Sequence, residues 1–476
     1  MEMDRRGLLA LAGTAAFSGA LAAVAGPGAQ RASAATGTAV VDPVQRGPVW
    51  EGFGTALCWF AHRIGGTATV RDTYADLLFD RTRGLGLNIV RYNIGGGENP
   101  AYPGHMDLRA RIPGYLASAT SAYDWSADAN QRWFLQAAKS RIPASEFLAE
   151  SFSNSPPWWM TISGSVTGGR NAAENLRTDS YAAFARYLVT VNERFRTAWG
   201  VDFRTLSPVN EPSAAYWTFG NRQEGNRMYP ANQAVMLQRL TEELARQGSP
   251  TRIAASDETS IDVGRDTVNS WSAQTRGLVG QYNVHSYEGS DRTGFKTAAR
   301  GTRIWDSEHG NGDASGMTLS QNILWDVKWL GASAFAYWQA VDSGGWGMLD
   351  TDLNNASADL SSFTRNKKFW AMAQWSRYVR RGYRVIGVSD NDTVAFHDEA
   401  GRRVVLVTVN NTPTAATVTY DLSRFASATA TATGVRTSGS QDLAALPPVA
   451  LSGNRFTASA PAMSTTTWVV PSMTQN

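Results

Sequence analysis

The strongest constraint on the fold of this chain is a long alternation between short apolar runs and segments with helical periodicity. The alternation runs from about residue 51 to about residue 374 and is typical of parallel βα units. Eight βα units of this size predict a closed (β/α)8 TIM barrel, whose active site lies at the C-terminal ends of its strands. The eight predicted strands are Gly52–Leu57, Asn88–Ile94, Glu146–Phe152, Thr205–Val209, Arg252–Ser256, Tyr282–Tyr287, Arg303–Ser307 and Ala334–Trp338.

Three of the intervening segments carry clear helix marks. Between Tyr181 and Phe195 the apolar residues recur mostly at steps of three and four. The segment 231–247 repeats this pattern and ends at Gly248, and the segment 319–330 ends at Gly331. A glycine at these points is favourable because it tolerates the positive φ that often ends a helix.

The composition changes near Arg380, where β-rich runs separated by Asn, Asp, Gly and Pro replace the βα pattern. We expect the barrel to span residues 51–379 and a small C-terminal β-sandwich to span residues 380–476. The segment 35–50 contains Thr38–Val41, a β-like run that we expect to pair into this sandwich.

The N-terminus resembles an export signal. Arg5 and Arg6 precede an Ala/Leu/Gly-rich run, and Ala32-Ser33-Ala34 fits an A-x-A cleavage site. We therefore expect a twin-arginine signal peptide over residues 1–34 and a secreted protein; an ordinary Sec signal and a membrane anchor are the alternatives. No later stretch approaches the length of a membrane span. The single cysteine, Cys58, excludes an intrachain disulfide, and its apolar neighbours predict a packed thiol.

Two glutamates stand at predicted strand ends. Glu211 lies in Val209-Asn210-Glu211-Pro212 after the fourth strand, and Glu308 follows the seventh. Each could be a solvated loop residue. However, the ends of strands four and seven face each other across the mouth of an eight-stranded barrel, so the carboxylates can converge. Such a pair is what glycoside hydrolysis needs: one carboxylic acid protonates the leaving oxygen, and the other attacks the anomeric carbon or activates water.

Other polar residues share faces at strand ends. Arg91 and Asn93 lie two residues apart on the second strand, and His285 and Tyr287 lie two apart on the sixth. An arginine beside a nucleophilic carboxylate would keep that carboxylate ionised, and a tyrosine could hydrogen-bond to it. An external salt bridge for Arg91 and a satisfied barrel histidine for His285 are the structural alternatives.

The chain contains 17 tryptophans, more than a core needs, which suggests flat surfaces for a ligand. The insertion Asn99–Asp128 is rich in Tyr, Pro and Gly and could shape a cleft, since long loops in compact domains are usually functional. A core position is the alternative for Trp338. The candidate binding residues near strand ends are Trp59, Asn154, Trp158, Trp217 and Trp338, and we expect Trp59 and Trp217 to belong to an exposed aromatic rim.

Several other classes of function lack a signal. With 44 Lys and Arg against 41 Asp and Glu, the chain has no bulk charge for binding nucleic acid. His309 beside Glu308 lacks the spacing of a metallopeptidase site, and Gly95-Gly96-Gly97 lacks the Lys-Ser/Thr of a phosphate-binding loop. We expect no metal, no cofactor, no membrane association after signal cleavage, and a monomer.

Four motifs together resemble glycoside hydrolase family 30. They are Arg91–Gly97, Ser153–Met160, Val209–Pro212 and Asp306–His309, and they occur in the family's order. The similarity covers nearly the whole chain after the signal. It implies a (β/α)8 barrel fused to a side β-sandwich, in agreement with the composition change near Arg380.

The resemblance also implies roles for individual residues. Glu211 would be the general acid/base and Glu308 the nucleophile of a retaining mechanism, and Asn210 would hold the 2-hydroxyl of the substrate. The carboxyl groups of a retaining pair lie about 5–5.5 Å apart, against about 6.5–9.5 Å in inverting enzymes, and we expect a bell-shaped pH–rate profile. The residues that would support the nucleophile are Arg91, Tyr287 and Trp338.

The segments Glu98-Asn99-Pro100 and Tyr123-Asp124-Trp125 are most similar to the endo-β-1,6-galactanase branch of the family. That branch implies a polysaccharide substrate, the β-1,6-galactan side chains of arabinogalactan. Other activities of the family remain open: glucuronoxylanase, β-1,6-glucanase, glucosylceramidase, and β-xylosidase or fucosidase. A non-catalytic carbohydrate-binding protein on a degenerate barrel is the alternative from a different class.

Overall fold

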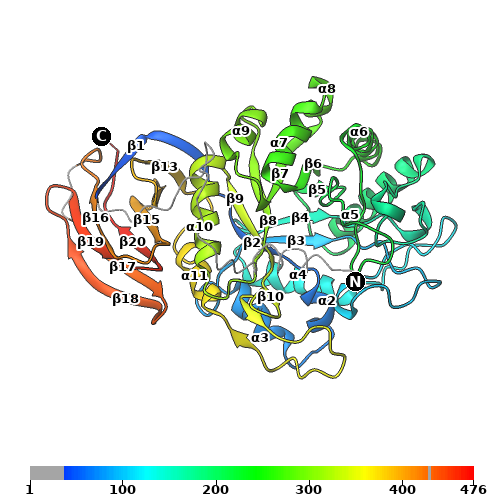
Figure 1. The fold of residues 1–476 in the computed structure, drawn as a ribbon, viewed down its shortest axis with the longest axis horizontal. Helices are drawn as coiled ribbons and strands as arrows, with labels where there is room; N and C mark the ends of the chain where they lie inside the picture. Colours follow the sequence, from blue (N-terminus) through cyan, green and yellow to red (C-terminus); the bar gives the residue numbers. More distant parts are fainter. Residues whose placement is uncertain (1–36, 427–429, 476) are drawn as a thin grey trace, which may run out of the picture.

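The computed structural model describes residues 37–426 and 430–475, so the predicted signal peptide, residues 1–34, lies outside the described residues. Its larger part is a closed barrel of eight parallel strands wrapped by helices, at the right of Figure 1. All eight predicted strands are present. They are β2 (Gly52–Ala56), β3 (Ile89–Asn93), β4 (Leu148–Phe152), β5 (Thr205–Ser207), β6 (Arg252–Ser260), β7 (Val279–Glu288), β8 (Ile304–His309) and β9 (Ala334–Gln339).

The predicted helices are also found. Gly248 and Gly331 both adopt positive φ, 64° and 66°, at the ends of α6 and of the π-helical turn η5. The helices of the barrel are α2 (Phe60–Ile64), α3 (Arg71–Phe79), α4 (Ala129–Arg141), α5 (Tyr181–Ala198), α6 (Pro230–Gln247), α7 (Ile261–Ser270), α8 (Ala273–Gly277), α9 (Arg292–Ala298), α10 (Met317–Trp325) with η5 (Asp326–Leu330), and α11 (Lys367–Ser376). None of the helices among the described residues is long and apolar enough to span a membrane.

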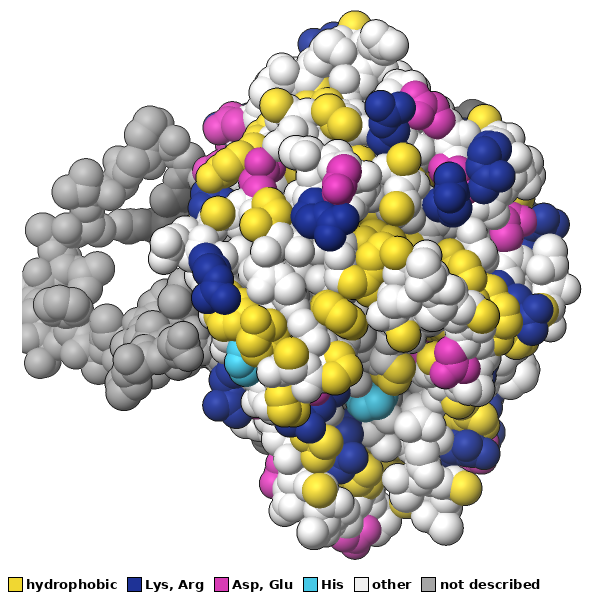
Figure 2. Space-filling view, turned by 90° about the vertical axis from the view of Figure 1, so that its right-hand side faces the viewer, with side chains coloured by type: hydrophobic (Ala, Val, Ile, Leu, Met, Phe, Trp, Pro, Cys, Tyr) yellow, Lys and Arg dark blue, Asp and Glu magenta, His cyan; other side chains and the backbone are white. Residues whose placement is uncertain are grey.

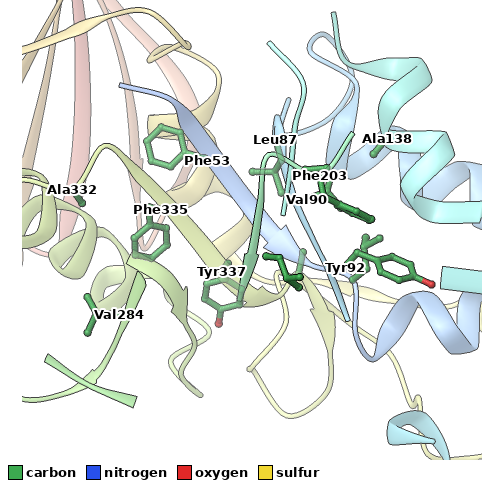
Figure 3. Close-up of a cluster of buried hydrophobic side chains, with 14 of the residues drawn as sticks. Phe53, Leu87, Val90, Tyr92, Ala138, Phe203, Val284, Ala332, Phe335 and Tyr337 are labelled. Atoms are coloured by element: carbon green, nitrogen blue, oxygen red, sulfur yellow. The ribbon is translucent and has the colours of Figure 1, made fainter. Parts of the chain in front are cut away.

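Side chains alternate along each barrel strand. On β3, Val90 and Tyr92 point outward into the large apolar cluster beneath the helices, which Figure 3 shows together with Phe335 of β9. The intervening Arg91 points into the barrel, where it contacts carboxylates from three other strands. Inside the barrel, an apolar layer of Ile89, Leu148, Trp305 and Ala334 lies below this charged layer.

Loops at the C-terminal ends of the strands carry short elements that surround the mouth of the barrel. The insertion after β3 lies at the right of Figure 1. Figure 2 shows that side of the molecule, where small patches of hydrophobic side chains lie between positively and negatively charged side chains. The short elements are η1 (Leu108–Ala110), η2 (Trp158–Met160), η3 (Arg170–Ala172), η4 (Thr178–Ser180), β10 (Val341–Asp342), β11 (Leu349–Asp350) and β12 (Thr364–Arg365).

The C-terminal part forms a nine-stranded sheet, at the left of Figure 1, in the order β18-β17-β20-β15-β14-β13-β1-β16-β19. The predicted N-terminal strand belongs to it: β1 pairs antiparallel with β13 and parallel with β16. Its strands are β1 (Gly37–Val49), β13 (Arg384–Val388), β14 (Thr393–Asp398), β15 (Arg403–Asn410), β16 (Ala416–Asp421), β17 (Thr431–Ser438), β18 (Gln441–Ala450), β19 (Arg455–Ala460) and β20 (Ser464–Val470).

The two layers of this sandwich are continuous through β1. Two register shifts against β13 interrupt the ladder of β1, and such irregularities let a strand bend from one layer into the next. The ring of Phe456 on β19 packs 5.4 Å from that of Trp468 on β20, so the two layers enclose an apolar core of their own.

Candidate active site

Glu211 and Glu308 meet at the mouth of the barrel. β5 ends at Ser207 before Pro208, which has no backbone N–H to continue the ladder, and the chain reaches Glu211 in the left-handed region at φ 48°. The backbone N–H of Glu211 donates to the carbonyl of Asp257 (2.8 Å), which fixes this unusual conformation. Both glutamates are fully buried, and an oxygen of each lies within 4.8 Å of the other. Two carboxyl groups with oxygens this close can act together on one bond of a substrate.

Arg91 is the fixed cation of the site. It donates to Glu150 (2.9 Å), Asp257 (2.8 Å) and Glu308 (3.2 Å), and all four side chains are fully buried. Burial alone would lower the pKa of Arg91, but the three carboxylates together raise it above its ordinary value. The external salt bridge considered for Arg91 is therefore wrong: its charge lies inside the barrel, where it faces Glu308.

His285 bridges the two glutamates. Its Nδ1 lies 3.1 Å from an oxygen of Glu211 and 3.5 Å from an oxygen of Glu308, and its Nε2 lies 3.1 Å from Asp257. Burial lowers the pKa of His285, but the charges of Glu308 and Asp257 outweigh burial and raise it to about 9. At neutral pH the ring is therefore an imidazolium that donates from both nitrogens.

Two carboxylates of this network were missed in the sequence. Asp257 accepts hydrogen bonds from Ser207 and Ser307 as well as from Arg91, and although burial raises its pKa, Arg91 and His285 lower it below its ordinary value. Asp257 follows the predicted fifth strand directly, so the rule that identified Glu211 and Glu308 would also have found it. Glu150 is an acidic residue in the middle of a buried strand, which is itself a signal of a paired charge.

A phenol contacts each glutamate. The hydroxyl of Tyr287 donates to Oε1 of Glu308 (3.0 Å), as the sequence suggested. The hydroxyl of Tyr216 donates to Oε2 of Glu211 (2.7 Å), which the sequence did not predict because Tyr216 lies in the irregular loop beyond Pro212. The two carboxylates thus have different donors, so the site is chemically asymmetric.

Asn210 is buried beside Glu211, and within the described residues neither its Oδ1 nor its Nδ2 has a hydrogen-bond partner. A buried amide without partners is rare, because leaving such a group unsatisfied costs about 1–3 kcal/mol. The amide of Asn210 is therefore available to hydrogen-bond a hydroxyl of a ligand.

Asn93 and Asn154 lie further out and bind each other. The Nδ2 of Asn93 donates to Glu224 (3.3 Å), and its Oδ1 accepts from the backbone N–H of Asn154 (3.3 Å). Glu224 also accepts from the N–H groups of Gly96 and Gly97, and burial raises its pKa to about 8. This cluster ties the glycine turn after β3 to the loop after β5, so Asn93 and Asn154 shape the rim of the site.

The predicted tryptophans occupy different environments. Trp59 and Trp338 pack edge to face, with ring centroids 5.0 Å apart, at the ends of β2 and β9. Trp158 in η2 is half-buried. The expected exposed rim is wrong for Trp217, which is 1% exposed and donates from its indole to the carbonyl of Glu211 (2.9 Å). Trp217 therefore supports the loop of Glu211 and offers no free face to a sugar.

Trp59 is also nearly buried, at 5% exposed, so the rim expectation fails for it as well. An additional indole, that of Trp346 after β10, was missed. A Cβ placed on Gly310 would lie 3.4 Å from the ring of Trp346 and 3.1 Å from Cβ of Trp338, so Gly310 permits both indoles to approach the segment that follows Glu308. The expected packed thiol of Cys58 is confirmed, since it is buried in the same apolar cluster as Trp59 and Trp338.

Among the described residues, Glu211, His285 and Glu308 are the group whose ligand-type atoms could surround a metal ion. His285 lies between the two carboxylates and would bind a metal ion only as the neutral imidazole. The arrangement also suits acid–base and nucleophilic chemistry by two carboxyl groups in unequal surroundings.

The chain is similar to known proteins in sequence and in fold. Residues 37–280 match the model of O-glycosyl hydrolase family 30. An endo-beta-1,6-galactanase from Hypocrea rufa is 34% identical over 421 residues, covering 83% of this chain and 85% of the relative. An exo-beta-1,6-galactobiohydrolase from Bifidobacterium longum is 22% identical; the match covers 79% of this chain and only 34% of that longer protein. Among solved structures, a conserved exported protein from Bacteroides fragilis superposes with a TM-score of 0.78 at 21% identity, covering 91% of this chain and 100% of the other.

Proposed function

Because the chain belongs to glycoside hydrolase family 30, we propose that it is a secreted, retaining endo-β-1,6-galactanase with Glu211 as acid/base and Glu308 as nucleophile. Membership of the family makes it a glycoside hydrolase; the substrate, the stereochemistry and the site of action are the proposal. The observation that carries it is the pair of buried carboxylates with oxygens within 4.8 Å of one another.

In the first step, an oxygen of Glu308 attacks the anomeric carbon as the glycosidic C–O bond breaks, and Glu211 gives its proton to the departing oxygen. Arg91 and Tyr287 donate to Glu308 (3.2 and 3.0 Å), so they hold the nucleophile in place before the attack. His285 and Tyr216 orient the carboxyl of Glu211 toward the leaving group.

In the second step, Glu211 takes a proton from a water molecule, and the water oxygen attacks the anomeric carbon of the glycosyl–Glu308 ester. The C–O bond to Glu308 breaks and the sugar leaves with its original configuration, while the proton taken from water makes Glu211 the acid for the next cycle. Asn210 would hold the 2-hydroxyl of the sugar through both steps, since its amide is buried beside Glu211 with both polar atoms free of partners in the described structure.

The β-1,6-galactan specificity is supported by the Hypocrea rufa relative, which covers most of both chains. Loops on a shared barrel can change the substrate that a glycosidase accepts, so the activity of this relative does not by itself establish the substrate of this chain. The Bifidobacterium longum relative acts as an exo-enzyme by its name, which makes endo against exo action the finer question.

Secretion is proposed from the sequence alone. Arg5 and Arg6 before an apolar run, followed by Ala32-Ser33-Ala34, are the features of a twin-arginine signal with its cleavage site. N-terminal sequencing of the protein from the culture medium of its host would give a start near Ala35 or Thr36. A full-length protein retained inside the cells would contradict the proposal.

The substrate is tested with linear β-1,6-galactan, β-1,6-glucan and glucuronoxylan in parallel. We expect oligosaccharides of several lengths from galactan at early times, which indicates endo action. Release from glucan or xylan but not galactan would contradict the substrate, and release of galactobiose alone from the start would contradict endo action. A Glu308→Gln variant serves as the inactive control.

A further inference from the structure

The insertion after β3 is bound across the mouth of the barrel. Arg109 in η1 donates to Asp342 of β10 (2.5 Å), both are buried, and the guanidinium lies 4.8 Å from the ring centroid of Trp59. Two residues earlier, Asp107 accepts from Arg222 in the loop after β5. If Arg109 moved away, Asp342 would remain buried without its opposite charge, which is costly. The ion pair therefore holds the insertion in one position.

The fixed insertion brings together an aromatic cluster, which we call the rim cluster: Tyr102, His105 and Phe219. The rings of Tyr102 and His105 are stacked, 5.4 Å apart at 12°, and the ring of Phe219 meets both edge to face at 5.1 and 5.2 Å. All three are only half-buried, and the exposed Arg170 holds its guanidinium 4.2 Å from the centroid of Phe219. Half-exposed aromatic rings held by a rigid anchor provide an apolar surface with polar groups at its edge, which suits a sugar ring.

The rim cluster lies on the side of Glu211. Phe219 is three residues beyond Tyr216, whose hydroxyl binds Glu211, so its Cα lies within about 10 Å of that of Tyr216. The backbone N–H of Phe219 donates to Gly169 (3.0 Å), which ties this loop to the one after β4. Glu308 lies on β8, Trp338 near the end of β9 and Trp346 after β10, on the other side of the mouth.

We propose that the rim cluster is a binding subsite for a galactose unit of the leaving portion of the chain, beyond the bond that is cleaved; this rests on the proposed function. The acid that protonates the glycosidic oxygen stands next to the leaving sugar, so the chain departs on the side of Glu211. Galactopyranose has its axial 4-hydroxyl on one face and a continuous row of C–H groups on the other, and that C–H face packs on an aromatic ring.

A β-1,6 linkage contains one more rotatable bond than linkages to ring carbons, so a galactan chain loses more conformational freedom when it binds. A second contact, away from the cleaved bond, fixes the position of the leaving sugar when the chain binds. Less conformational freedom then remains to be lost when the reacting geometry forms. The rim cluster thus acts on the polysaccharide and on its longer oligosaccharides.

The test compares two substrates in the variants Tyr102→Ala and Phe219→Ala. On reducing-end-labelled β-1,6-galactohexaose we expect kcat/KM to fall about 3- to 10-fold in each variant. On 4-nitrophenyl β-1,6-galactobioside, which has no sugar beyond the cleaved bond, kcat/KM should stay within about twofold of the wild type. The bond of the labelled hexaose that is cleaved most often should also change, because the altered subsite no longer helps to position the hexaose along the cleft.

Trp133→Ala is the matched control, since Trp133 on α4 is a half-buried indole with Arg71 4.3 Å from its ring, on the outside of the barrel. It should leave the ratio of the two substrates unchanged. Equal losses on both substrates, or none on either, would overturn the subsite. If the wild type cleaves another glycan in place of galactan, the proposed function fails, and the same ratio is then measured with the oligosaccharide and aryl glycoside of that glycan.

Discussion

The imidazolium of His285 makes stability depend on pH in a way that one substitution can isolate. The pKa of His285 is about 9 in the folded protein, against 6.5 for an unperturbed side chain. This difference corresponds to about 3 kcal/mol of folding free energy, and the group is fully buried, so solvent does not screen it. Because the folded value is the higher one, the stabilisation is complete below about pH 6.5 and is lost as the pH rises through about 9.

We therefore predict that the wild type exceeds the variant His285→Gln in free energy of unfolding by an amount that falls by about 3 kcal/mol between about pH 6 and pH 9.5. The assay is urea unfolding followed by tryptophan fluorescence at three pH values. Other groups titrate in this range, including Glu224, and the subtraction of variant from wild type cancels them.

His309→Gln is the control. His309 is also buried, and burial lowers its pKa to about 3, so it is neutral in the folded state throughout and in the unfolded state above about pH 7.5. Its difference from the wild type should rise by less than about 1 kcal/mol between about pH 6 and 7.5, the direction opposite to that of His285, and should be constant from there to about pH 9.5. A constant difference for His285→Gln as well, within the error of the extrapolation, would refute the charged imidazole between the two carboxylates.

Three further predictions concern single residues. Glu211→Gln should lower kcat on the polysaccharide about 10²- to 10⁴-fold, and much less on an aryl glycoside with a good leaving group, which steady-state kinetics on both substrates will measure. Asn210→Ala should lower kcat/KM about tenfold or more and leave the melting temperature nearly unchanged, because the described structure gives its amide no internal hydrogen bond to lose; a large fall in melting temperature with unchanged kinetics would contradict the role. Arg109→Met should destabilise the protein by about 3–5 kcal/mol in urea unfolding, because Asp342 would remain buried without its cation, and Asp342→Asn in the same background should recover part of the loss.

Most of the barrel could be predicted because its signals are local. Each strand is an apolar run between breakers, and helix ends such as Gly248 are set by the backbone conformation of one residue. The meeting of Glu211 and Glu308 also followed from the sequence, since the closure of eight βα units places strand ends four and seven across the mouth.

The remaining features depend on contacts between distant parts of the chain. Arg91 is surrounded by carboxylates from β4, β6 and β8, and no periodicity in the sequence pairs them. The position of Trp217 in the loop after Glu211 predicts an exposed indole, but whether a loop indole is exposed depends on what packs over it, and Trp217 is buried. The anchoring of the insertion by Arg109 and Asp342, 233 positions apart, is of the same kind.

The central claim is that Glu308 is the nucleophile of a double displacement with Glu211 as its acid/base. Incubation with a 2-deoxy-2-fluoro-β-1,6-galactobiosyl fluoride, which forms the glycosyl–enzyme ester but hydrolyses it slowly, tests this directly. Mass spectrometry of the digested protein should find the sugar on the peptide that contains Glu308, and a Glu308→Gln variant should remain unlabelled. Labelling of another carboxylate, or hydrolysis that gives the inverted anomer by NMR without any labelled species, would contradict the account.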